Sequence, residues 1–318
     1  MGRVSHWCDE FANRAEIELF FWRKLRQVRA NGARMKENTA SGTALSVAKV
    51  RAAHQLIDDE PRILNDPVAL RLIGDDAIEA IRADANLRSN ARFAAFRAHI
   101  VMRNRYAEDC LSAAVERGVS QYALLGAGYD TFAYRQPPWA AGLRIFEVDH
   151  PVTQAAKREL LASCGVALPA NLSFAPVNFE SESLREGLER AGFDFSQAAF
   201  FSCLGVLVYL DEKSVEELFR FAGSMAPGSE IVFTFSQPDA ALDARELEVR
   251  AKINATVSEM GEPWRSYFEP GRLRELLLHA GFSEVSFLSP EEANERYFRG
   301  RSDALRPPRQ VRLGRAVK

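Results

Sequence analysis

Two hydrophobic patterns divide the chain, and the second begins near residue 118. Beyond that point, short apolar runs predict five strands, at 121–125, 144–148, 172–176, 198–202 and 230–236. Amphipathic segments between and after them predict helices near 153–163, 182–191, 213–225 and 271–280. Apolar residues within 281–288 and 310–317 can supply further strands. Because strands alternating with helices form parallel sheets covered on both faces, we predict a doubly wound α/β domain.

Before residue 118 the periodicity is helical. Helices are expected at 43–54, from Pro67 onwards and over 91–117, where apolar residues recur at helical spacing. We therefore predict three parts, listed here in chain order: an N-terminal helical extension (1–40), a helical lid region (41–117), and the α/β domain (118–318) with a lid insertion near 240–275. The apolar residues of the extension must pack on the core or on a second subunit, so this segment offers a homodimer surface.

Composition limits the binding partners and the cellular compartment that can be expected for this chain. A formal net charge of −2 gives no reason to expect nucleic acid. The chain has no run of about 20 apolar residues, so no membrane contact is predicted. The cysteines are scattered, without a Cys-x-x-Cys pair, which argues against a metal site and fits a reducing cytoplasm. These features leave a small molecule as the expected partner.

A glycine-containing turn follows the first predicted strand. Gly126 and Gly128 let the backbone approach a ligand closely, and Asp149 ends the next strand, where an acid can accept hydrogen bonds from ribose hydroxyls. A dinucleotide site would have a third glycine at the position of Thr131. The bulkier loop suits a nucleoside ligand without a phosphate, S-adenosyl-L-methionine (SAM). An NAD-dependent oxidoreductase is the alternative.

Six short segments carry a resemblance to a known family. They are residues 43–51 (TALSVAKVR), 64–67 (LNDP), 103–106 (RNRY), 125–135 (LGAGYDTFAYR), 146–151 (FEVDHP) and 204–210 (LGVLVYL). In this order they resemble the leucine carboxyl methyltransferase family, especially its bacterial SAM-dependent branch, which includes polyketide O-methyltransferases. The resemblance covers about residues 40 to 290. It implies the class I methyltransferase fold, a mostly parallel seven-stranded sheet, and O-methylation of a carboxyl or hydroxyl group on a small, apolar or polyketide-like acceptor.

The resemblance also suggests further cofactor contacts. Where the family has an Asp-Leu pair at the adenine, this chain has Asn178 and Phe179, and the asparagine can still accept a hydrogen bond from the adenine amino group. The SAM carboxylate needs a cation: on the long helix we favour Arg103 over Arg105, and Lys49 and Arg51 are second candidates. With Gly126, Gly128 and Asp149, these residues make up the predicted cofactor site.

The sequence says less about the site of the methyl acceptor than about the cofactor site. A carboxylate acceptor is already ionised, whereas a hydroxyl acceptor needs a base; the titratable candidates are His54, His99, His150 and Tyr209, and we assign none of them. Five aromatic residues near the C-terminus are expected to wall the acceptor pocket: Trp264, Tyr267, Phe268, Tyr297 and Phe298. The family often has an acid at the position of Leu204. Together with Asn178, this departure keeps open a SAM-binding protein without catalysis.

Overall fold

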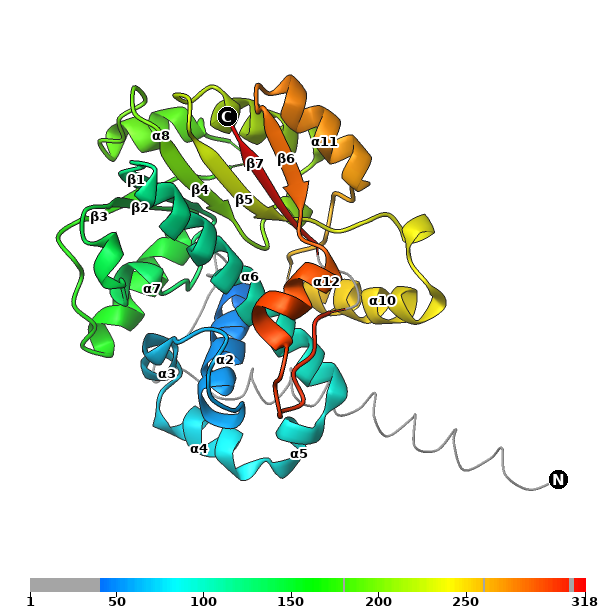
Figure 1. Cartoon of the computed structure of the whole chain (residues 1–318). Coiled ribbons are helices and arrows are strands. Elements are labelled where there is room, and N and C mark those ends of the chain that lie inside the picture. The colour runs from blue at the N-terminus through cyan, green and yellow to red at the C-terminus, as the bar shows by residue number, and fades with distance from the viewer. Residues whose placement is uncertain (1–40, 180, 260, 309–311) are drawn as a thin grey trace.

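The architecture is a seven-stranded sheet with helices on both faces (Figure 1). The computed structural model describes residues 41–179, 181–259, 261–308 and 312–318. The predicted N-terminal extension, with its homodimer surface, lies outside these residues. The strands are β1 (Gln121–Leu125), β2 (Arg144–Asp149), β3 (Leu172–Pro176), β4 (Ala199–Cys203), β5 (Glu230–Thr234), β6 (Glu284–Phe287) and β7 (Leu313–Val317). Their order is β3-β2-β1-β4-β5-β7-β6.

Strands β1 to β5 are parallel, and β7 lies antiparallel between β5 and β6. This confirms the mostly parallel seven-stranded prediction. The chain runs from β1 outwards to β2 and β3, and then returns to β4 on the other side of β1. Because the order reverses there, the loops after β1 and β4 diverge and leave a crevice at the carboxyl ends of these strands.

The helices that precede the sheet are α2 (Gly42–Ile57), α3 (Pro67–Ile73), α4 (Asp75–Ala83), α5 (Ala85–Ser89) and α6 (Ala91–Glu116). Those that follow β2 are α7 (Pro151–Ser163), α8 (Leu184–Arg190), α9 (Glu212–Gly223), α10 (Ala244–Glu259), α11 (Pro270–His279) and α12 (Pro290–Ala293), continued by a π-helical turn (Asn294–Phe298). Short 3-10 turns follow β1 (Phe132–Tyr134 and Pro138–Ala140), β4 (Leu207–Tyr209) and β5 (Asp239–Ala241). Within the described residues, no helix has a stretch that is long and apolar enough to span a bilayer.

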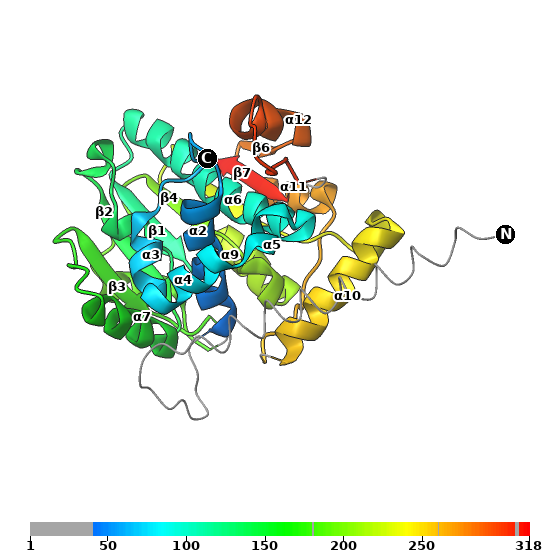
Figure 2. The ribbon, with the colours of Figure 1, turned by 90° about the horizontal axis from the view of Figure 1, so that it is seen from below.

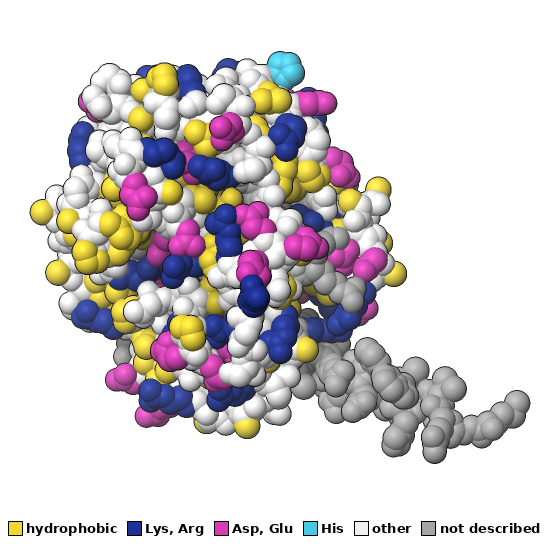
Figure 3. All heavy atoms as spheres, viewed as in Figure 1, with side chains coloured by type: hydrophobic (Ala, Val, Ile, Leu, Met, Phe, Trp, Pro, Cys, Tyr) yellow, Lys and Arg dark blue, Asp and Glu magenta, His cyan; other side chains and the backbone are white. Residues whose placement is uncertain are grey.

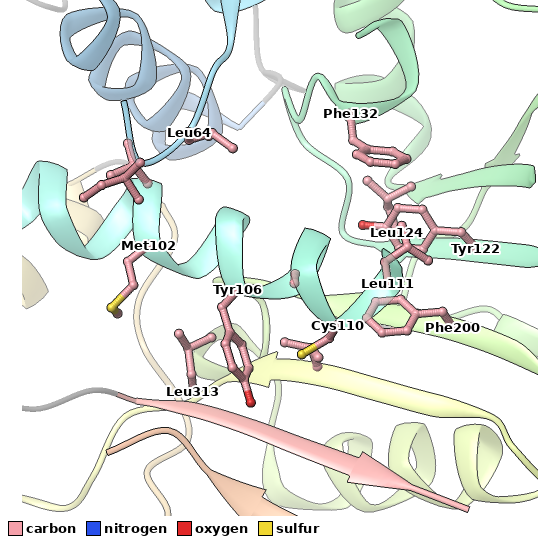
Figure 4. Packing of buried hydrophobic residues seen from close by; sticks show 14 of the residues in the cluster. Leu64, Met102, Tyr106, Cys110, Leu111, Tyr122, Leu124, Phe132, Phe200 and Leu313 are labelled. Atoms are coloured by element: carbon pink, nitrogen blue, oxygen red, sulfur yellow. The ribbon is translucent and has the colours of Figure 1, made fainter. Parts of the chain in front are cut away.

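Alternate residues of each strand feed two separate cores. Tyr122 and Leu124 of β1, with Phe200 of β4, pack against α6, whose Tyr106 and Leu111 reach the sheet (Figure 4). Residues of opposite parity pack on the other face against α8, α9 and α11. A third cluster joins α2 to α6 through Val50, Ala53 and Ile100. Burial on both faces explains why these strands appear as continuous apolar runs in the sequence.

Helix α10 is the largest element that the sequence pattern does not predict. It lies at the periphery of the molecule in two perpendicular views (Figures 1 and 2). Of its 16 residues, only Arg250 and Val257 are buried. Its apolar residues Val249, Ile253 and Val257 recur at every fourth position but give only a short, weak amphipathic pattern, although the helix falls inside the lid insertion predicted near 240–275.

Candidate active site

A cavity of about 1320 Å³ opens at the carboxyl ends of the central strands. All six residues predicted to bind a cofactor line it: Arg103, Gly126, Gly128, Asp149, Asn178 and Phe179. They come from α6, the loop after β1, the end of β2 and the segment after β3. The fold therefore brings together residues that are up to 76 positions apart in the sequence.

The two glycines of the first loop are required by its shape. Gly126 has φ +68° and Gly128 has φ +49°, values in the left-handed region that other residues rarely adopt. A Cβ on Gly126 would lie 2.3 Å from Cγ2 of Val206, and one on Gly128 would lie 3.0 Å from Cβ of Ala44. The loop is thus held between the segment after β4 and the first turn of α2.

Asp149 is fixed at the end of β2 by backbone donors. Its carboxylate accepts hydrogen bonds from the N–H groups of Gly128 and His150. Burial raises the pKa of Asp149 and outweighs these two bonds, which act in the opposite direction. Glu147, two residues earlier, is instead buried against Lys157, with 2.8 Å between Oε2 and Nζ, so it forms a structural ion pair.

A buried network of hydrogen bonds supports the loop that contains Gly126 and Gly128. Asp66 accepts hydrogen bonds from Arg51 Nε (2.8 Å) and the Thr131 hydroxyl (2.7 Å). Arg51 also donates through Nη2 to the Tyr129 carbonyl at 2.5 Å. Burial alone would raise the pKa of Asp66, but Arg51 and Arg135 outweigh it and hold that pKa below its usual range. Arg51 lines the cavity, yet these bonds occupy its guanidinium, which leaves Arg103 as the better carboxylate ligand.

Arg103 has hydrogen-bonding capacity to spare. Its Nε atom is buried and has no hydrogen-bond partner within the described part of the chain. Burial, followed by repulsion from Arg51, lowers the pKa of Arg103 to about 10, so the group stays charged at neutral pH. Its guanidinium lies against Gly205 (φ +77°), where a Cβ would approach Nη1 to 2.9 Å. Gly205, which the sequence did not single out, thus makes room for the arginine.

The other half of the cavity is walled by different elements. Apolar side chains from α6, α10 and the segments after β4 and β5 line it: Phe96, Ile100, Leu204, Val208, Phe235, Leu242, Val249, Ile253 and Val257. Of the five aromatic residues expected here, only Trp264 lines the cavity. Phe268 and Phe298 are buried in the two cores, Tyr297 packs against the α6 core, and Tyr267 stacks on Arg250 of α10. The prediction of an aromatic C-terminal wall was wrong for those four, because aromatic content does not distinguish core from pocket.

The comparisons with known proteins agree with this geometry. The family model of leucine carboxyl methyltransferases matches residues 44–223. The chain belongs to this family. One relative, from Bacillus subtilis (strain 168), is named "Putative S-adenosyl-L-methionine-dependent methyltransferase YktD"; it is 30% identical, and the match covers 89% of this chain and all of that protein. A second relative, Franean1_4929 of Parafrankia sp. (strain EAN1pec), has the same kind of name and is 31% identical over 77% of this chain and 78% of its own length.

A solved structure supports the fold alone. A Thermobifida fusca protein described as a methyltransferase superposes with a TM-score of 0.51 at 20% identity, covering 86% of this chain and 94% of that one. With family membership shown, the dinucleotide-dependent alternative loses its basis, since Thr131 stands where the third glycine would be.

The cavity satisfies the requirements of the cofactor that this family uses. Glycines leave space along the loop, Asp149 presents a carboxylate oxygen for hydroxyl groups, and the orphaned Nε of Arg103 can take a carboxylate. Asn178 and Phe179 line the cavity after β3, where the backbone N–H of Asn178 donates to Glu182 at 2.8 Å. The assignment of these six residues to the cofactor remains a prediction.

Two of the four titratable candidates line the cavity with pKa values that do not suit them to accept a proton at neutral pH. His99 lines the cavity, but burial and the nearby Arg103 and Arg312 lower its pKa to about 3. Tyr209 also lines it, and burial raises its pKa. His54 is buried away from the cavity and bonded to Asp58 at 2.8 Å. The exposed His150 lines the cavity, and its ring caps α7 by accepting a hydrogen bond from the N–H of Val152. Within the described residues, no cluster of three His, Cys, Asp or Glu side chains could hold a metal ion.

Proposed function

We propose that this SAM-dependent methyltransferase transfers the methyl group to an oxygen atom of a small, largely apolar acceptor. The observation that carries the proposal is that one cavity holds both the polar groups at the ends of β1 and β2 and an apolar wall from α6 and α10. When bound, SAM supplies an activated methyl group on a sulfonium. The protein's own work is then to hold, orient and desolvate the acceptor.

The acid–base properties of the wall favour an acceptor that is already ionised. With a pKa of about 3, His99 is too weak a base to draw a proton from an ordinary alcohol. A carboxylate, or an acidic phenol or enol of the polyketide type, needs no such help. We therefore propose carboxylic acids and acidic hydroxyl compounds as substrates, in a cytoplasmic enzyme whose scattered cysteines suit a reducing compartment.

Charge on the surface gives no support to a nucleic acid acceptor. On the face shown in Figure 3, basic and acidic side chains are intermixed. With a net charge of −2, such a surface lacks the electrostatic attraction that phosphate backbones require. A small molecule remains the proposed partner.

Two measurements test the proposal. Titration calorimetry should show micromolar binding of SAM, about −8 kcal/mol, and none of NAD. Incubation with SAM and a panel of aryl acids, phenols and simple alcohols should release S-adenosylhomocysteine with the acids or phenols and not with the alcohols. SAM binding without turnover on any member of a broad panel would instead favour a non-catalytic SAM-binding protein.

A further inference from the structure

Several arginines line the cavity away from the predicted cofactor residues, and three of them, Arg250, Arg306 and Arg312, differ in how they are bonded. Arg250 of α10 donates to Asp239 (2.8 Å) and to the Ser236 hydroxyl (3.0 Å) through its two Nη atoms. Arg306 donates through Nη1 to two backbone carbonyls, each at 2.6 Å. The Nη2 atom of Arg312, by contrast, is buried and has no hydrogen-bond partner within the described residues. An orphaned guanidinium nitrogen is costly unless a ligand completes it.

The position of Arg312 is set by the sheet. Its carbonyl accepts a hydrogen bond from the N–H of Phe235 at 3.2 Å, which extends the antiparallel pairing of β7 with β5 by one residue. The strand order places β7 two positions beyond β4. At about 4.8 Å per strand, the start of β7 lies about 10 Å across the sheet from the end of β4. Arg312 therefore lies in the half of the cavity that is lined by α6, α10 and the segments after β4 and β5, which we call the acceptor half.

The electrostatic surroundings of Arg312 are mixed. Burial lowers its pKa to about 10, so the guanidinium remains charged at neutral pH. Glu246 and Glu269 act to raise that pKa, whereas Arg250 lowers it further. On the facing helix α6, His99 is uncharged near pH 7 because Arg103 and Arg312 add to the effect of its burial. Among the residues that the structure describes, no negative group forms a hydrogen bond to Nη2, so this nitrogen can still bind an anion.

We propose that Arg312 is a specificity-determining residue that binds a carboxylate on the acceptor, at a distance from the oxygen that is methylated. This inference rests on the proposed function and adds to it the class of acceptor: an apolar body with an anionic group at one end. The body would lie along Phe96, Val249 and Ile253, which line the same half of the cavity. Arg103, beside Gly205 after β4, remains for the cofactor's own carboxylate.

The test compares two probes of one shape, 2-naphthylacetate and the uncharged 2-naphthylacetamide. Both are titrated calorimetrically into the full chain saturated with S-adenosylhomocysteine. Wild-type protein should bind the acid about tenfold to a hundredfold more tightly than the amide, as expected for a charge-assisted bond in a buried site. Arg312→Gln should reduce this ratio to near one and leave the affinity for S-adenosylhomocysteine unchanged. Arg312→Lys, which keeps the charge without the planar fork, should retain part of the preference.

Arg306→Gln is the matched control, because Arg306 lines the same cavity but is exposed and already bonded to backbone. It should keep the wild-type ratio. The inference is overturned if Arg312→Gln keeps the preference, if wild type shows none, or if neither probe binds. It is also overturned if Arg312→Gln weakens S-adenosylhomocysteine but not 5′-methylthioadenosine, since Arg312 would then serve the cofactor. Failure of wild type to bind S-adenosylhomocysteine would refute the proposed function instead.

Discussion

The two halves of the cavity are built in different ways. The half lined by the six predicted cofactor residues, here called the cofactor half, consists largely of loops at strand ends. Its groups are fixed by buried hydrogen bonds, such as those joining Arg51, Asp66 and Thr131. The acceptor half depends on α10, which buries only two of its residues, and on partly exposed side chains such as Val249, which is 39% exposed. A rigid, preorganised site can bind a ligand that all members of a family share. The sequence of a loosely packed element, by contrast, can change with little cost to the stability of the fold. Substitutions should therefore affect the two halves unequally.

The largest effect is expected from Gly128→Val in the cofactor half. The variant forces a β-branched residue into φ +49° and places its Cβ 3.0 Å from Ala44, in the path predicted for the ligand. SAM affinity should fall by more than about a hundredfold, or about 3 kcal/mol, in calorimetry. Gly142→Val is the control, because no atom lies within 4 Å of its added Cβ, and its affinity should match wild type. Normal SAM binding by a folded Gly128→Val protein would show that the loop does not touch the cofactor.

Asp149→Ala should come next, with SAM bound about 1–3 kcal/mol more weakly because the ribose hydroxyls lose a charged acceptor. The comparison is Glu147→Gln on the same strand. Loss of its buried ion pair with Lys157 should lower the melting temperature while the affinity for SAM stays at the wild-type value. If both variants weakened SAM equally, the effect would be on folding and not on the site.

The raised pKa of Asp149 gives this site a pH dependence. Bonds from ribose hydroxyls favour the ionised carboxylate, so SAM binding should release a proton wherever Asp149 is partly protonated. Wild-type affinity should then fall as the pH drops through this raised pKa, by up to about tenfold per pH unit. Calorimetry at a series of pH values should show this slope, and Asp149→Ala should lack it.

Arg103→Gln is expected to weaken SAM by about tenfold, because a buried charge-assisted bond to its carboxylate is lost. The affinity for 5′-methylthioadenosine, which has no carboxylate, should not change. Arg105→Gln is the matched control, since Arg105 is an exposed residue on the same helix that pairs with Asp109. Equal losses for both ligands would mean that Arg103 supports the cavity without contacting the carboxylate.

The smallest effect should arise in the acceptor half. Arg250→Gln removes the hydrogen bonds that join α10 to Asp239 and Ser236. The free energy of local unfolding of α10 should therefore fall by about 1 kcal/mol. Hydrogen exchange of the α10 amides should accelerate about fivefold, with β1 and β4 unaffected and SAM bound as in wild type. Leu247→Ser, at an exposed position of the same helix, should have no such effect. Equal acceleration in the central strands would show that α10 is part of the cooperative core.

The sequence by itself determined the sheet and placed most of the predicted cofactor residues at one edge of it. Continuous apolar runs identified five strands within a few residues, because strands buried on both faces leave a strong local pattern. Gly126, Gly128 and Asp149 follow such strands directly, so their placement at the carboxyl edge followed from the topology. Asn178 and Phe179 were reached through the family resemblance, and Arg103 through the need of the SAM carboxylate for a cation; all three line the cavity.

Tertiary structure alone decided how the acceptor half is made. Nothing local in the sequence separates the buried Phe268 and Phe298 from the cavity-lining Trp264, since all are aromatic residues in one C-terminal region. Helix α10 carries only a short apolar stripe, and Gly205 matters only because Arg103 lies against it. Arg312 becomes a candidate ligand only when antiparallel pairing of β7 with β5 brings it to the cavity opposite α6. Such contacts depend on which distant segments the fold juxtaposes, and local periodicity cannot record that information.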